Sequence, residues 1–131
     1  MGYDAAVYKA VGINRLISLA NRERRILVTR SKKVFKLKQT FNRILITREH
    51  YQDQLQEMKK YIELNEANLF ARCSECNAEL FEIDKDKIKD LIPEYVFSNF
   101  SRFLICRRCG RIYWQGSHYH QIRSQLHKIF G

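Results

Sequence analysis

The 131-residue sequence contains a single proline, only five glycines and no long run of apolar residues. Because 45% of its residues are apolar, this scarcity of turn-forming residues excludes a disordered chain and predicts a modest hydrophobic core. No stretch approaches the roughly eighteen apolar residues that a membrane-spanning helix needs, and no apolar signal segment stands at the start. We therefore expect a soluble intracellular protein without a membrane partner, in a compartment that its sequence does not specify.

Acidic residues are absent from residues 100–131, which contain six Lys or Arg. Residues 1–50 contain twelve basic residues against three acidic ones, whereas residues 51–99 contain six against eleven. The net charge of +10 is therefore divided between two terminal blocks. Such charge predicts a polyanionic partner, of which nucleic acid is the commonest. The alternative is a solvated basic face that only aids solubility.

The four cysteines of the chain form two Cys-x-x-Cys pairs. Cys73 and Cys76 make the first pair, and Cys106 and Cys109 make the second, with 29 residues between the pairs. An asparagine follows the first pair and a glycine follows the second, as is typical of tight turns. Two such turns supply four thiolates, which close a tetrahedral Zn²⁺ site and leave no position for substrate or water. We predict a structural zinc ion, and a pair of disulfides is the alternative that an intracellular location disfavours.

Two further observations bear on this site. His118 and His120 lie close to the second pair in sequence and could compete as ligands, but four cysteines already complete the site.

A unit of about 60 residues buries too little surface to be comfortably stable alone. Structural zinc contributes on the order of 10–16 kcal/mol of apparent binding energy to such folds. Loss of any one cysteine is therefore expected to unfold this half of the chain.

Apolar periodicity predicts an α/β unit in the first half. Residues 12–24 are expected to form an amphipathic helix. Residues 25–30 and 43–48 are continuous β-branched runs, typical of strands buried on both faces. Residues 31–42 are long enough for a crossover, so the two strands are expected to be parallel. An apolar residue at every third or fourth position predicts a helix over residues 49–66.

The second half is expected to form hairpin-like strands around the two cysteine pairs. A short helix over residues 84–91 is expected to be capped by Asp84 and to stop just before Pro93. Ser117 is expected to cap a last helix. We place the domain boundary between residues 68 and 69, which gives domains 1–68 and 69–131. The predicted strands of the second domain are residues 69–72, 79–83, 102–105 and 111–114.

Several sequence motifs resemble those of a known family. They are RC-x-x-CN-x-x-L at residues 72–80, IPEYV at 92–96, C-x-x-CGRIYW-x-GSH at 106–118, GYDA at 2–5 and RILVTR at 25–30. Together they resemble the Mut-seven C-terminal RNase domain family, in which a PIN-like nuclease fold is followed by a zinc ribbon. The resemblance implies an α/β fold: a partial PIN-like three-layer unit with a short parallel sheet, followed by a small zinc ribbon with four cysteine ligands.

The resemblance also implies where a nuclease would hold its metal. PIN-type folds cluster carboxylates that bind Mg²⁺ or Mn²⁺ against a phosphodiester, because these ions prefer oxygen ligands. In the family a strand with an acidic residue and a helix precede the GYDA motif, a second acidic cluster opens the next helix, and a third acid follows a Thr-Arg pair. Here no strand or helix precedes GYDA, residues 12–15 read GINR, and Ser31 stands in the third position.

Asp4 and Glu23 are the only acidic residues before Glu49. We expect Asp4 to serve in a turn or cap and Glu23 to form a surface ion pair. These departures assign no catalytic residue and favour a protein that is not an enzyme as it stands.

Three functions remain open. The first is RNA binding, with Arg107 and Arg108 inside the second cysteine pair. Tyr113, Trp114 and Tyr119 could stack on bases. The alternative is that Trp114 and Tyr113 fill the ribbon core, and we favour this alternative for Trp114. The second is a Mg²⁺- or Mn²⁺-dependent ribonuclease, and the third is a basic scaffold that binds an acidic protein. Lys36 and Lys38 extend the basic run of the first half. The candidate nucleic-acid contacts are Arg24, Arg25, Arg30, Lys32, Lys33, Arg107, Arg108, Arg111, His118 and Arg123.

Overall fold

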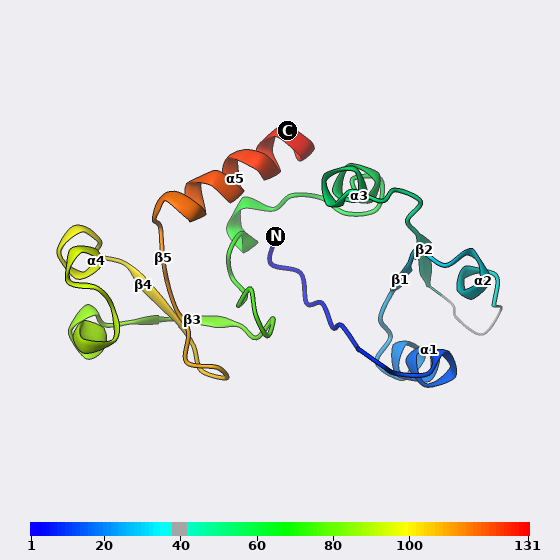
Figure 1. Ribbon diagram of the computed structural model, residues 1–131, viewed down its shortest axis with the longest axis horizontal. Helices are drawn as coiled ribbons and strands as arrows, with labels where there is room; N and C mark the ends of the chain where they lie inside the picture. Colours follow the sequence, from blue (N-terminus) through cyan, green and yellow to red (C-terminus); the bar gives the residue numbers. More distant parts are fainter. Residues whose placement is uncertain (38–41) are drawn as a thin grey trace. The chain divides into compact units, whose positions relative to one another are not determined.

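The computed structural model describes residues 1–37 and 42–131, which form two compact units (Figure 1). The α/β unit comprises Val7–Ile62. The ribbon unit comprises Met1–Ala6 together with Glu63–Gly131, so the first six residues belong with the second half of the chain. The predicted domains, residues 1–68 and 69–131, stay a prediction. No helix within the described ranges is both long and apolar enough to cross a membrane.

The α/β unit contains the predicted parallel strand pair. Strand β1 (Leu27–Thr29) pairs with β2 (Arg43–Leu45) in parallel, with Leu27 opposite Arg43. Helix α1 (Ile13–Arg22) is the predicted amphipathic helix, and it buries Ile17 and Ala20 against Leu27. The short helix α2 (Lys32–Phe35) lies in the predicted crossover, whose residues 38–41 fall outside the described part of the chain.

The prediction that both strands are buried on both faces is wrong for β1. Leu27 is buried, whereas its neighbours Ile26 and Val28 are 55% and 50% exposed. Successive side chains of a strand point to opposite faces, and α1 packs against only one face of β1. Ile44 and Ile46 in and after β2 are buried. A continuous apolar run cannot distinguish a strand with one covered face from a strand with two.

The predicted helix over residues 49–66 is shorter in the structure. Helix α3 spans Tyr51–Met58, after which the Tyr61 N–H donates to the Met58 carbonyl at 2.8 Å in a tighter turn. Tyr51 is exposed and Leu55 is only half-buried, so packing adds little to extend the helix. A separate 3-10 turn, η1, covers Glu66–Asn68.

The ribbon unit contains an antiparallel sheet in the order β3-β4-β5 (Figure 1). Its strands are β3 (Leu80–Ile83), β4 (Phe103–Cys106) and β5 (Ile112–Trp114), close to three of the four predicted ones. The fourth, residues 69–72, contributes only a single bridge between Arg72 and Glu79. One face of the sheet packs on a small core. The core cluster consists of Ile88, Val96 and Phe103, with Ile83, Ile92, Phe100, Ile112 and Trp114 against it.

The helical segments of the ribbon unit confirm some predictions and correct others. The 3-10 segment η2 (Lys85–Leu91) begins at Asp84, whose carboxylate accepts the Asp86 N–H as predicted. Helix α4 (Glu94–Asn99) was not predicted, because a six-residue helix with one buried residue has too short an apolar period. Helix α5 (Ser117–Phe130) has Gly116 at its N-cap and no side-chain cap, so the expected cap by Ser117 is wrong.

Candidate metal centre and basic surface

The two cysteine pairs form turns, or knuckles, of the same construction. In the first knuckle the Asn77 N–H donates to the Cys73 carbonyl at 3.0 Å, and in the second the Gly110 N–H donates to the Cys106 carbonyl at 2.8 Å. Each turn ends on a left-handed residue, with φ of 58° at Asn77 and 75° at Gly110. Asparagine and glycine are the residues that adopt this conformation most readily. Sequence and turn geometry therefore agree at both knuckles.

The knuckles bring the four cysteines together. Their sulfur atoms all lie within 4.8 Å of one another, and no histidine, including His118 and His120, belongs to the group. Cys73 Sγ lies 3.6 Å from Cys109 Sγ, and Cys76 Sγ lies 3.4 Å from Cys106 Sγ. A tetrahedron with Zn–S bonds of about 2.3 Å places its sulfurs about 3.8 Å apart. The donor set and its spacing therefore fit a tetrahedral thiolate-bound metal ion.

The sulfurs also have very different acidities. Burial raises the pKa of the Cys73 thiol, but hydrogen bonds from the Tyr113 hydroxyl and from the backbone N–H groups of Cys76 and Glu75 outweigh it and lower the pKa to about 6. A backbone hydrogen bond from Arg111 lowers the pKa of Cys109, whereas burial and the three neighbouring thiols raise it to about 12. Cys73 thus ionises first and helps to raise the pKa of Cys76 and Cys109, whereas a backbone hydrogen bond from Cys109 lowers the pKa of Cys106. A divalent cation removes this repulsion and allows all four thiolates to form.

Tyr113 was expected to stack on bases or to fill the ribbon core, and the structure gives it a third role. Its hydroxyl lies 3.0 Å from Cys73 Sγ and 3.2 Å from Ser74 Oγ. Burial and the Cys73 sulfur raise the pKa of this phenol, so it stays protonated and can donate to the thiolate. Trp114 packs against the ribbon core, as expected. Tyr119 packs on Phe70, with ring centroids 4.2 Å apart.

The second knuckle carries exposed positive charge. The Arg107 guanidinium lies 4.0 Å above the centre of the Phe81 ring. Arg108 donates to the Cys76 carbonyl at 3.4 Å and thereby joins the two knuckles. Arg111 forms an ion pair with Glu75 at 3.7 Å. Arg107 and Arg108 are both exposed, so this knuckle presents two guanidinium groups to solvent.

The remaining predicted contacts are dispersed. Arg25 pairs with Glu23 at 2.7 Å, Arg30 with Glu49 at 3.9 Å, and Arg123 with Glu66 at 3.1 Å. Acidic partners neutralise these three positions in part. Lys38 lies outside the described residues. The exposed candidates that complete the set are Arg24, Lys32, Lys33 and His118.

The two N-terminal acidic residues are held by arginines. Asp4 lies 3.7 Å from Arg72, and Glu23 forms the predicted surface ion pairs with Arg22 and Arg25. Within residues 1–37 and 42–131, the four cysteines are the group of three or more Cys, His, Asp or Glu side chains that could hold a metal ion. The other four residues, 38–41, read KQTF and include none of these types.

Comparison with models of known protein families matches residues 1–126 with the family described as the Mut7-C RNAse domain. Searches among curated proteins and among solved structures find no match. The match extends over both units and includes the four cysteines.

Proposed function

Because the chain belongs to the Mut7-C RNAse domain family, we propose that it binds RNA through a basic surface shaped by a structural zinc ion and does not itself cleave the RNA. The observation that carries this proposal is the closed group of four cysteine sulfurs directly beside the exposed Arg107 and Arg108. The metal shapes the knuckle, and the knuckle presents the two arginines.

Zinc is the metal that this donor set favours. Four thiolates at tetrahedral spacing suit Zn²⁺, whereas Mg²⁺ and Mn²⁺ require oxygen ligands. Cys73, Cys76, Cys106 and Cys109 would hold the ion and leave no coordination position for a substrate. Its contribution is therefore to cross-link two turns of a small unit.

The second knuckle suits contact with an RNA backbone. Stacking on Phe81 fixes the plane of the Arg107 guanidinium, while its N–H edge remains available for a phosphate. Arg108 is tied to the first knuckle by a single long hydrogen bond and retains further donors. Arg111 and Arg123 already face Glu75 and Glu66, so we expect them to contribute less.

RNA binding can be measured by fluorescence anisotropy of a labelled single-stranded RNA at several salt concentrations. In the metal-loaded protein we expect the R107A/R108A double variant to weaken binding about tenfold. For single strands each lost phosphate contact lowers the slope of log K against log salt by about 0.7, so the slope is expected to fall by about 1.4. Arg102→Ala is the matched control, because Arg102 is an exposed arginine paired with Glu82 at 2.6 Å. Absence of RNA binding at low salt, or an equal loss in the control, contradicts the proposal.

The family match favours one other candidate, a Mg²⁺- or Mn²⁺-dependent ribonuclease. The ion pairs of Asp4 with Arg72 and of Glu23 with Arg25 argue against a ribonuclease, because both carboxylates already have arginine partners. Labelled RNA incubated with either ion decides between the two functions. Cleavage that Asp4→Asn or Glu23→Gln abolishes establishes the enzyme. Capture of an acidic protein by a chain that does not bind RNA instead establishes the protein scaffold.

A further inference from the structure

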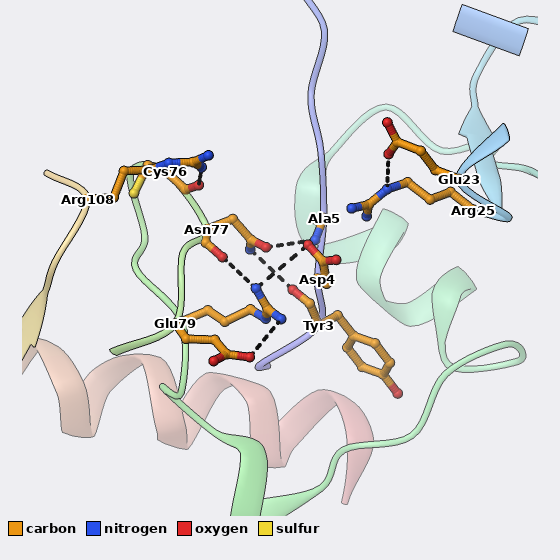
Figure 2. A network of polar contacts seen from close by, with 10 residues as sticks. Tyr3, Asp4, Ala5, Glu23, Arg25, Cys76, Asn77, Glu79 and Arg108 are labelled. Atoms are coloured by element: carbon orange, nitrogen blue, oxygen red, sulfur yellow. Dashed lines mark hydrogen bonds and ion pairs between the residues drawn. The ribbon is translucent and has the colours of Figure 1, made fainter. Parts of the chain in front are cut away.

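The first knuckle holds the beginning of the chain through one side chain, Asn77. Its Oδ1 accepts the Ala5 N–H at 2.8 Å, and its Nδ2 donates to the Tyr3 carbonyl at 3.2 Å (Figure 2). One amide group therefore pairs with backbone groups two residues apart, as a neighbouring strand would. These contacts join positions separated by more than 70 residues in sequence.

Arg72 binds the residue between those two backbone groups. Its Nη1 lies 3.7 Å from Asp4 Oδ1, and its Nη2 lies 3.6 Å from Glu79 Oε1. Nη1 also donates to the Asn77 carbonyl at 2.8 Å. Because only 22% of the Arg72 side chain is exposed, its attraction to Asp4 is less screened than that of a surface pair. Asn77 thus binds the backbone, and Arg72 selects an acidic side chain.

Both residues of this site flank the metal ligands. Arg72 directly precedes Cys73, and Asn77 directly follows Cys76. The left-handed backbone of Asn77, with φ of 58°, belongs to the knuckle turn itself. The direction of the Asn77 amide therefore depends on the conformation that the first cysteine pair adopts.

The bound segment is anchored at its other end as well. The Tyr3 hydroxyl donates to the Glu63 carbonyl at 2.9 Å and accepts the Glu63 N–H at 3.2 Å. Gly2 has φ of +78°, and a Cβ there would lie 2.0 Å from the Asn68 carbonyl oxygen. Only glycine fits this approach. The first residues of the chain therefore contact Glu63 and Asn68, which follow directly after the α/β unit.

We propose that Arg72 and Asn77 form a peptide-binding site whose ligand is the chain's own segment, residues 3–5, and that the metal ion holds this site in shape. The ligand is an extended segment with a central acidic residue, bound by its carboxylate and by the backbone on either side of it. The inference rests on the proposed metal centre. With metal bound, Asn77 and Arg72 hold residues 3–5, and without metal the contacts of Tyr3 with Glu63 remain.

Hydrogen exchange of the Ala5 amide, followed by NMR on the full-length metal-loaded chain, tests this site. Asn77→Gly removes the side chain but retains a residue that favours the left-handed turn. We expect this variant to keep its full metal content and to exchange the Ala5 amide about 5- to 30-fold faster, the effect of losing two modest hydrogen bonds. Asn99→Ala is the matched control, because among the described residues the Asn99 amide bonds only locally, to the Tyr95 carbonyl. It is expected to leave the exchange unchanged.

Metal removal provides the second arm. A chelator is expected to accelerate Ala5 exchange in the wild-type chain at least as much as Asn77→Gly does, and added Zn²⁺ is expected to restore protection in the wild-type chain alone. Unchanged protection in metal-loaded Asn77→Gly overturns the peptide site, and unchanged protection after chelation overturns its dependence on metal. A chain that takes up no metal overturns the metal centre, while the comparison of Asn77→Gly with the wild-type chain still decides the peptide site.

Discussion

At the scale of single residues, hydrogen bonds to the sulfurs distinguish the four cysteines from one another. Cys73 is buried and receives the Tyr113 hydroxyl, whereas Cys109 is exposed and has a raised pKa. Donors outside the ligand set commonly tune a metal site as much as a change of ligand does. The Tyr113 hydroxyl has this position relative to the proposed metal centre, and its hydrogen bond lowers the pKa of Cys73.

Tyr113→Phe is expected to weaken zinc binding about tenfold at neutral pH, within the range typical of such donors. The Tyr113 hydroxyl helps to hold the pKa of Cys73 near 6, below its ordinary value of 9.0. In the variant the pKa of Cys73 rises, so this thiol is still protonated at pH 7 and zinc must displace its proton. In the wild-type chain Cys73 has already lost that proton at pH 7. The difference in zinc affinity is therefore greatest below the lower pKa, shrinks between the two pKa values and disappears above the higher one. Competition with a chromophoric chelator across this range measures it.

Tyr95→Phe is the control for this measurement, because Tyr95 lies in the same unit and is 71% exposed. Equal zinc affinity in Tyr113→Phe and the wild-type chain at pH 7 would show that the hydroxyl does not act on the metal.

At the scale of elements, the two knuckles repeat one design with different residues. The left-handed position is Asn77 in the first and Gly110 in the second, and an added Cβ at Gly110 meets no atom within 4 Å. Only the backbone conformation therefore restricts that position.

The helices show where a local sequence pattern is informative. Helix α1 buries a continuous apolar stripe and was predicted, whereas α4 buries only Val96 and was missed.

The repeated design predicts a ranking of substitutions at Gly110. Gly110→Ala is expected to destabilise the metal-loaded ribbon unit by about 1 kcal/mol, because a left-handed backbone is unfavourable for alanine. Gly110→Asn is expected to cost clearly less, since asparagine already occupies the same place in the first knuckle. Urea unfolding followed by Trp114 fluorescence ranks the two variants. Equal or reversed costs would mean that the knuckles are not equivalent.

At the scale of the whole molecule, stability of the ribbon unit is expected to depend on the metal ion. Its fully buried side chains are only Phe103, Ile88, Cys73 and Cys106, of which two are proposed ligands. Such a small core leaves little stability without a cross-link. The α/β unit has its own core of Ile17, Ala20 and Leu27 and does not share these ligands.

Chelation is therefore expected to unfold the ribbon unit and to shift the emission of Trp114, the only tryptophan, to longer wavelength. Zinc is expected to reverse the shift, and Cys76→Ser is expected to show the shifted spectrum with or without zinc. Ser74→Ala, next to the same knuckle, should behave like the wild-type chain. An emission spectrum that chelation leaves unchanged would show that the ribbon unit folds without metal.

The sequence by itself determined the group of four cysteines that could hold a metal ion and the parallel strand pair. Both depend on local chemistry, because a Cys-x-x-Cys turn aims two sulfurs at one point and a β-branched run favours a strand. The position of Tyr113 beside Cys73, the pairing of Asp4 with Arg72 and the capture of residues 3–5 by Asn77 were decided only by the tertiary structure. These contacts join residues 40 or more positions apart, and the packing that brings such residues together leaves no periodic pattern in the sequence.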